Sequence, residues 1–161
     1  MSASTTGVVA TWSLSQKKIV NSFVVPSSID YIAASRDASV LIIVSGTVVS
    51  LFRASSNEML AQFVANFDVS SAEFTPDSRW IMIVGNNEIL FRQVSGGCAS
   101  HAHKFDAGNI MAIAAASGRF AVLNLVVDDD GNGRTNLYES GDAGYGTLWP
   151  AKGNLQMILS R

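Results

Sequence analysis

The residues best able to bind a ligand lie in one acidic segment, residues 128–139, with the sequence DDDGNGRTNLYE. This segment fits the calcium-loop pattern D-x-[DN]-x-[DN]-G-x5-E. Oxygen ligands at alternate positions of such a loop converge on a hard cation, because the glycine lets the chain turn back sharply. The pattern assigns ligands to Asp128, Asp130, Asn132 and Glu139, with Gly133 at the turn. A solvated hairpin turn is the alternative, since Asp, Asn and Gly tolerate the positive φ angles of tight turns.

The two histidines form an H-x-H pair, His101 and His103, whose side chains would share one face of a strand and would suit zinc. The nearest further ligands, Cys98 and Asp106, do not complete a recognised zinc spacing. Cys98 and His101 could act as nucleophile and base, but no residue is found that would orient them. The sequence contains no G-x-S-x-G, P-loop or G-x-G-x-x-G motif. We therefore predict that His101 and His103 lie on an edge strand and that Cys98 is a loop thiol. Because no catalytic site is predicted, the chain is not expected to be an enzyme.

The composition describes a chain that buries most of its residues. Of 161 residues, 48% are hydrophobic and 15% are charged, so a single domain over residues 1–161 is expected, with elements covered on both faces. The net charge of −2 gives no electrostatic reason to expect nucleic acid or an anionic membrane as a partner. The start shows no signal sequence, and no apolar run approaches the ~18 residues of a membrane span. We predict a cytoplasmic or nuclear protein that does not insert into a membrane.

A short string, LFR, occurs at 51–53 and again at 90–92, an offset of 39 residues. The same offset places Gly46 on Gly85. Upstream, SRDASVLIIV aligns with TPDSRWIMIV at an offset of 40. The aromatic residues of the two strings, Phe52 and Phe91, have two counterparts along the chain: Trp12, forty residues before Phe52, and Tyr138, 47 residues after Phe91. A period near 40 predicts a repeat architecture, with units of approximately 12–51, 52–90 and 91–137.

Each unit can be divided into four short strands. The second strand is a continuous apolar run, such as VLIIV or WIMIV, which suits a strand buried on both faces. One stretch favours a helix instead: NIMAIAAASG (109–118) has an Asn that could cap, an alanine-rich body and a terminal Gly. The repeat register places a strand there, and we follow the register. The predicted fold class is therefore all-β.

Four strands in about 40 residues, with an aromatic residue ending the third strand, resemble the blades of the WD-repeat β-propeller family. The string FTPDS (74–78) is similar to the Ser-Pro-Asp-Gly turn of that family, and the four aromatic residues stand where its Trp-Asp tryptophan would be. The resemblance covers roughly residues 7–140 and implies a degenerate propeller, because no Asp follows any of the aromatics and no Gly-His pair precedes a first strand. It predicts an arc of about 3.5–4 four-stranded antiparallel blades. A β-sandwich or a meander of similar strands is the alternative.

An arc of this length would leave exposed strand edges and a half-buried blade face, whereas propellers usually close with 4–8 blades. Three arrangements meet this constraint: a four-bladed ring completed by NLQMILSR (154–161), a half-ring completed by a second copy or another subunit, or a fragment of a longer chain. A mean hydropathy of +0.25 favours completion by another chain. The resemblance thus implies a non-enzymatic scaffold for protein–protein interactions, whose partner is another protein or a second copy of itself.

The acidic segment resembles a further family. It is similar to the D-x-D-G-D-G-x-x-D-L calcium loops of FG-GAP propeller blades. That resemblance implies calcium ligands at Asp128, Asp130, Asn132, the carbonyl of Arg134, and Asn136. Two asparagines stand where that family prefers Asp, which lowers the charge of the ligand set and the expected affinity. The alternative function is therefore a calcium-stabilised, ligand-binding propeller, and no other cofactor is expected.

Overall fold

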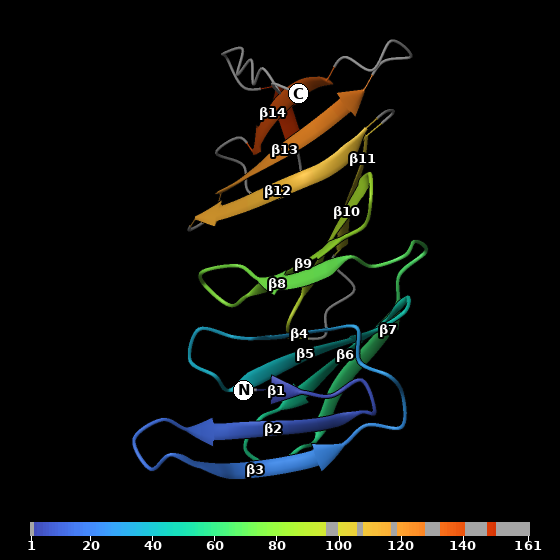
Figure 1. The fold of residues 1–161 in the computed structure, drawn as a ribbon. Helices are drawn as coiled ribbons and strands as arrows, with labels where there is room; N and C mark the ends of the chain where they lie inside the picture. The colour runs from blue at the N-terminus through green and yellow to red at the C-terminus, as the bar shows by residue number, and fades with distance from the viewer. Residues whose placement is uncertain are drawn as a thin grey trace. The chain divides into compact units, whose positions relative to one another are not determined.

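The computed structural model describes residues 2–95, 100–105, 108–116, 119–127, 133–140 and 148–150. All regular elements in these ranges are β-strands, which form four antiparallel sheets (Figure 1). The predicted all-β class is therefore confirmed. Among these residues no helix has the length and apolar character needed to cross a bilayer.

Each sheet is a meander whose strands neighbour one another in chain order. The first sheet contains β1 (Ser2–Ala3), β2 (Val8–Ser13) and β3 (Lys18–Val24). The second contains β4 (Tyr31–Ala34), β5 (Val40–Ser45), β6 (Val48–Arg53) and β7 (Met59–Val64). The third contains β8 (Ser71–Phe74), β9 (Trp80–Val84), β10 (Glu88–Gln93) and β11 (Ser100–Lys104). The fourth contains β12 (Asn109–Ala116), β13 (Arg119–Val127), β14 (Gly133–Ser140) and β15 (Leu148–Pro150).

The chain divides into two compact units, Met1–Phe74 and Thr75–Arg161, here called the first and second units. The first unit holds β1 to β8 and the second holds β9 to β15. Each unit has its own hydrophobic core, and the two are described separately.

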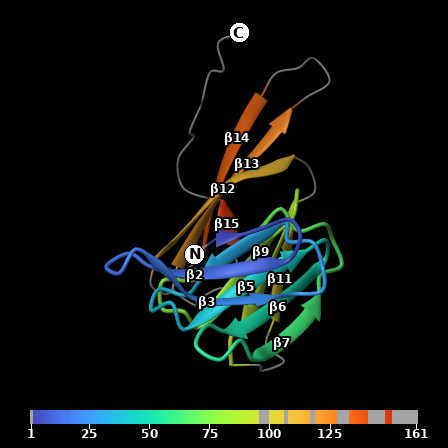
Figure 2. The same ribbon diagram turned by 60° about the horizontal axis from the view of Figure 1, so that its bottom comes forward.

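The core of the first unit lies between its first two sheets. Val9 of β2 packs with Leu41 and Ile43 of β5, and the rings of Phe23 and Phe52 lie 5.3 Å apart. Figure 2 shows β2 and β3 beside β5 and β6. Successive residues of β5 are buried from Leu41 to Val44, although their side chains alternate between the two faces of the sheet. This confirms the prediction that the apolar runs form strands buried on both faces.

The core of the second unit joins β9 and β10 to β13 and β14. Met82 and Phe91 are buried there with Phe105 and Val122, and the Phe105 and Tyr138 rings lie 4.9 Å apart. These apolar contacts hold the sheet of β9 and β10 against the fourth sheet.

The alanine-rich stretch forms strand β12 and pairs with β13 from Asn109 to Ala116, as the repeat register predicts. The residue that precedes β12 must be a glycine. Gly108 has a φ of +83°, and a Cβ at this position would lie 2.2 Å from the carbonyl oxygen of Leu125. Pairing with a neighbouring strand therefore overrides the helical propensity of the alanines.

The predicted alignment of the two LFR strings is wrong by one residue. Leu41 faces Phe52 across the second sheet, whereas its equivalent Ile81 faces Arg92 across the third. The offset in the third strands is thus 40, and Phe91 corresponds to Leu51. Because side chains alternate between faces, a shift of one residue changes the face on which a side chain lies. Phe91 and Leu51 are accordingly buried, while Phe52 is half-buried.

The glycines aligned with the strings are also not equivalent. Ser45 pairs with Val48 around the hairpin, and Gly85 occupies the place of Ser45 because its N–H donates to the Glu88 carbonyl. By contrast, the alignment of Trp12 with Phe52 is confirmed. Trp12 pairs with Ile19 in the first sheet, forty residues before Phe52 pairs with Met59, each after a bulge.

A backbone bond repeats with the same period of 40. The residue after each outer strand donates its N–H to the hairpin between the two preceding strands of its sheet. The three bonds are Val25 to Gly7 at 2.9 Å, Ala65 to Thr47 at 2.8 Å, and Phe105 to Asn87 at 2.9 Å. All three donor residues are buried, so each bond anchors the connection between one sheet and the next.

The structure adds one strand that the sequence analysis did not predict. Strand β1 precedes β2 and pairs with it through Ser2 and Ala10. Two local features explain the pairing. The indole Nε1–H of Trp12 donates to the Ser2 hydroxyl at 3.0 Å, and Gly7 turns the chain with a φ of +87°.

The strand register predicts that Phe91 and Phe52 contribute differently to stability, so each variant serves as a control for the other. We expect Phe91→Ala to lower the free energy of unfolding by about 3–5 kcal/mol, because a fully buried ring is removed. Phe52→Ala removes a half-buried ring and should cost less than about 2 kcal/mol. Urea denaturation followed by circular dichroism measures both changes. Equal costs would favour the offset of 39 and contradict the register described above.

Candidate functional site

The predicted calcium ligands lie only partly within the described residues. Asp128, Asp130 and Asn132 fall outside them. Asn136 and Glu139 lie in β14, three and six residues beyond the first residue of that strand. At the usual rise of a strand these distances are about 10 Å and 20 Å. Asn136 is therefore closer than Glu139 to the start of β14. Because the first three predicted ligands are not described, the calcium site stays a prediction.

Asn136 pairs across the sheet with Asn124 of β13. Asn124 is buried, and its amide Nδ2 has no hydrogen-bond partner among the described residues. Within the same part of the chain, no group of three His, Cys, Asp or Glu side chains lies close enough to hold a metal ion.

The two histidines lie on β11, the outermost strand of the third sheet, as predicted for edge-strand histidines. The His101 ring lies 5.6 Å from the ring of Trp80, and the His103 ring lies edge-on to Phe91 at 6.1 Å. Both imidazoles thus extend the aromatic packing of the sheet. Cys98, which was predicted to be a loop thiol, falls outside the described residues.

A turn built around an aspartate joins the first and second strands of the second sheet. The Asp37 carboxylate accepts hydrogen bonds from the Ser35 hydroxyl at 2.6 Å and from the Ser39 N–H at 3.0 Å. The Ser35 hydroxyl oxygen in turn accepts a bond from the Val40 N–H at 3.0 Å. Between them Ala38 adopts a positive φ of 57°, at the place of the glycine in the Ser-Pro-Asp-Gly turn.

The same turn recurs forty residues later in the FTPDS string. The Asp77 carboxylate accepts bonds from the Thr75 hydroxyl at 2.6 Å and from the Arg79 N–H at 3.1 Å. The Thr75 oxygen accepts a bond from the Trp80 N–H at 3.1 Å, and Ser78 has a φ of +54°. The two turns, here called the Asp turns, satisfy buried hydroxyl groups within six residues of sequence.

These hydrogen bonds stabilise the ionised carboxylates. The bond from Ser35 and then those from Ser39 lower the pKa of Asp37 to about 2. Burial alone would raise the pKa of Asp77, but the bonds from Thr75 and Arg79 and the charge of Arg79 outweigh it and lower that pKa. Both Asp turns therefore carry a negative charge at neutral pH.

One face of the first sheet is apolar and exposed, and we call it the outer face. Cross-strand pairs place Val8 with Val24, and Trp12 with Ile19, on this face. The exposed fractions are 42% for Val8, 69% for Val24, 46% for Trp12 and 49% for Ile19. The opposite face, with Val9, packs on the second sheet.

In the second sheet, the residues equivalent to Val8 and Trp12 are less exposed. Forty residues after Val8 and Trp12 stand Val48 and Phe52, on the face of the second sheet toward the first. Val48 and Phe52 are half-buried, although the outer-strand residue Val64 is as exposed as Val24. The difference at β2 thus reflects a missing cover. The sequence analysis predicted a half-buried blade face but did not assign it to a particular sheet.

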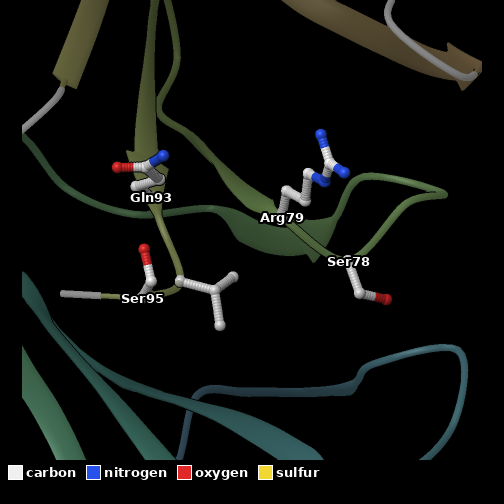
Figure 3. A pocket seen from close by; sticks show the side chains of 5 residues that line it. Ser78, Arg79, Gln93 and Ser95 are labelled. Atoms are coloured by element: carbon white, nitrogen blue, oxygen red, sulfur yellow. The ribbon is translucent and has the colours of Figure 1, made fainter. Parts of the chain in front are cut away.

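A hollow of about 440 Å³ lies at the turn end of β9 and β10 in the second unit (Figure 3). It is lined by Ser78, Arg79, Gln93, Val94 and Ser95, and we call it the turn pocket. The Val94 N–H donates to the Arg79 carbonyl at 2.9 Å, so the two turns that form the pocket are bonded to each other.

The comparisons with known proteins agree on the fold. No family model matches the sequence, and no curated protein matches it. Among solved structures, the chain is similar to Kuenenia stuttgartiensis hydrazine synthase, with a TM-score of 0.65 and 10% identity over 89% of this chain and 47% of that one. It is also similar to the β-propeller domain of Myceliophteria thermophila Cps50 (Swd1), with a TM-score of 0.61 and 12% identity over 83% and 59%.

A third similar structure is that of the RRP9 WD40 repeats, with a TM-score of 0.61 and 14% identity over 94% of this chain and 56% of that one. Identities this low show the fold alone. The chain thus has a β-propeller-like fold, as the repeat predicts, with three four-stranded antiparallel sheets and one three-stranded sheet among the described residues. It spans about half the length of the structures it matches.

The Asp turns predict a specific loss of stability in acid. Because their pKa values are lowered by folding, their stabilising effect is complete above about pH 4 and declines as the pH falls toward the folded pKa, about 2 for Asp37. We expect Asp37→Ala and Asp77→Ala to lower the Tm at pH 7 and to flatten its decline between about pH 4 and pH 2. Thermal melting across this range measures both effects. The control, Asp68→Ala, removes an exposed carboxylate outside the turns and should leave the profile unchanged.

The calcium prediction is tested by melting the chain with calcium and with a chelator. If the acidic loop binds calcium, we expect the Tm to rise by several degrees in millimolar calcium, because a ligand that binds only the folded state stabilises it. Asp130→Ala should abolish the rise, and Asp129→Ala, which alters a position outside the ligand pattern, should preserve it. The absence of any shift at millimolar calcium would reject the site.

Proposed function

We propose that the chain is a non-enzymatic scaffold for protein–protein interaction, completed by a further blade that another chain supplies. The outer face of the first sheet carries this proposal. Its four apolar side chains are exposed, whereas the equivalent β6 side chains of the second sheet are partly covered by a neighbouring sheet. Burial of such a face yields roughly 25 cal/mol per Å², so covering it is strongly favourable.

The shape of the face fits another blade. It is the surface of a twisted antiparallel sheet, and sheets of this kind pack on one another through interdigitating apolar side chains. The first and second sheets of the same unit already pack in this way through Val9, Leu41 and Ile43. A second copy of the chain is one possible source of the covering blade.

The fold by itself does not decide whether the chain catalyses a reaction. The similar structures include an enzyme, hydrazine synthase, as well as WD40 domains. The scaffold proposal rests on the apolar outer face together with the packing roles of the two histidines, which the sequence analysis weighed as zinc ligands and, for His101, as a base. We propose a cytoplasmic or nuclear location for this scaffold.

Light scattering of the whole chain over a range of concentrations tests the proposal. With no partner present, we expect the outer face to self-associate, so that the mean mass rises above 17.1 kDa as the concentration increases. Trp12→Asp should suppress the rise, because it places a charge in the middle of the face.

The matched control is Leu14→Asp. Leu14 is 90% exposed, but it lies in the turn after β2 and outside the outer face, so this change should leave the mass profile as it is. A constant mass of 17.1 kDa at all concentrations, or equal effects of the two variants, would contradict the proposal.

A further inference from the structure

The fourth sheet has an apolar face on the side opposite to the third sheet, and we call it the far face. Val122 of β13 and Tyr138 of β14 belong to the core shared with the third sheet. Because side chains alternate along a strand, Leu125, Val127 and Leu137 lie on the other side of the fourth sheet. Val127 is 59% exposed, and Leu125 and Leu137 are half-buried. The far face is therefore apolar and still accessible.

Within each unit, neighbouring sheets pack on one another in the same order. In the first unit, Val9 of the first sheet lies against Leu41 and Ile43 of the second sheet. In the second unit, Ile89 of the third sheet stands two repeat periods after Val9 and lies in the core with Val122 of the fourth sheet. The earlier sheet of each pair thus uses the face that Val9 marks, and the later sheet uses its opposite face.

This packing order matches the far face to the outer face of the first sheet. The far face is turned away from the third sheet, so it is the kind of face that an earlier sheet places on a later one. The outer face carries Val8 and Trp12, the equivalents of Val48 and Phe52, so it is the kind of face that an earlier sheet covers. The two faces therefore complement each other as the sheets within each unit do.

We propose that the blade covering the outer face is the fourth sheet of a second copy of the chain, packed through its far face. This inference rests on the scaffold function proposed above and names its partner. Two copies then form two equivalent contacts, because each copy supplies one outer face and one far face. Each contact removes apolar side chains of both copies from water, which is the main driving force of association.

The similar propellers support a closed pair of chains. The chain spans about half the length of the WD40 and Swd1 propeller structures that it matches. A ring of that size therefore needs about two chains of this length. A contact between unlike faces generates a closed ring when its rotation closes, and an open filament when it does not. We expect closure with two copies, which leaves neither an outer face nor a far face exposed.

Light scattering of the whole chain over a range of concentrations tests the pairing, with one variant in each face. We expect the mass of the unmodified chain to level off at twice 17.1 kDa. Val127→Asp should weaken the association at least about tenfold, as Trp12→Asp should, because each variant places a charge in the contact. Val127 is mostly exposed, so its replacement should leave the Tm of the chain nearly unchanged.

The matched control is Arg134→Asp. Arg134 is exposed and pairs with Val126, and both lie on the face of the fourth sheet toward the third. This variant introduces an aspartate into the same hairpin without changing the far face, and should alter the association less than about twofold. If Val127→Asp fails to fold, Val127→Lys replaces it, because a positive charge beside the acidic segment 128–130 avoids repulsion between like charges.

A mixture of the two face variants identifies which faces meet. Trp12→Asp retains an intact far face, and Val127→Asp retains an intact outer face, so an equimolar mixture regains one of the two contacts. We expect the mean mass of the mixture to exceed that of either variant alone at the same total concentration. A mixture without this increase would overturn the proposal, and so would a mass that rises beyond twice 17.1 kDa.

Failure of this inference can be told apart from failure of the scaffold proposal. If Trp12→Asp suppresses association but Val127→Asp does not, the outer face meets a surface other than the far face. The scaffold proposal then stands, and the pairing proposed here is overturned. If the unmodified chain keeps a mass of 17.1 kDa at all concentrations, both proposals are overturned.

Discussion

Burial of the central strands on both faces is the constraint on which the rest of the structure depends. From Leu41 to Val44 and from Ile81 to Val84, every residue is buried, so each of these strands needs apolar cover on either side. A single sheet cannot provide this cover, and sheets must therefore stack. The same requirement applies to the first sheet, whose outer face has no cover among the described residues and exposes Trp12. The proposed scaffold role rests on this exposed face.

The sequence predicted the fold well because its signals are periodic and redundant. The apolar runs, the Asp turns and the aromatics repeat near 40 residues, and the strand pairing of β12 shows that this period outweighed a local helical signal. It failed at the LFR strings because a three-residue match carries no information on which face a side chain takes. Only the pairing of Ile81 with Arg92 reveals that Phe91 corresponds to Leu51.

The candidate surfaces were less predictable because exposure depends on neighbours that a sequence does not place. Trp12 and Phe52 occupy equivalent positions, yet one is exposed and the other is half-buried. The turn pocket escaped detection for a related reason. Its lining comes from two turns fourteen residues apart, which the bond from the Val94 N–H to the Arg79 carbonyl brings together.

The Asp turns fix one turn of the second sheet and one turn of the third sheet by local bonds. Each turn satisfies its own carboxylate, hydroxyl and backbone groups within six residues. Ser39 and Arg79 occupy the same position after the two aspartates, and one bonds back to Asp37 through its hydroxyl while the other lines the turn pocket. A repeated turn can therefore keep its structural role in both blades while the residue after its aspartate differs in charge.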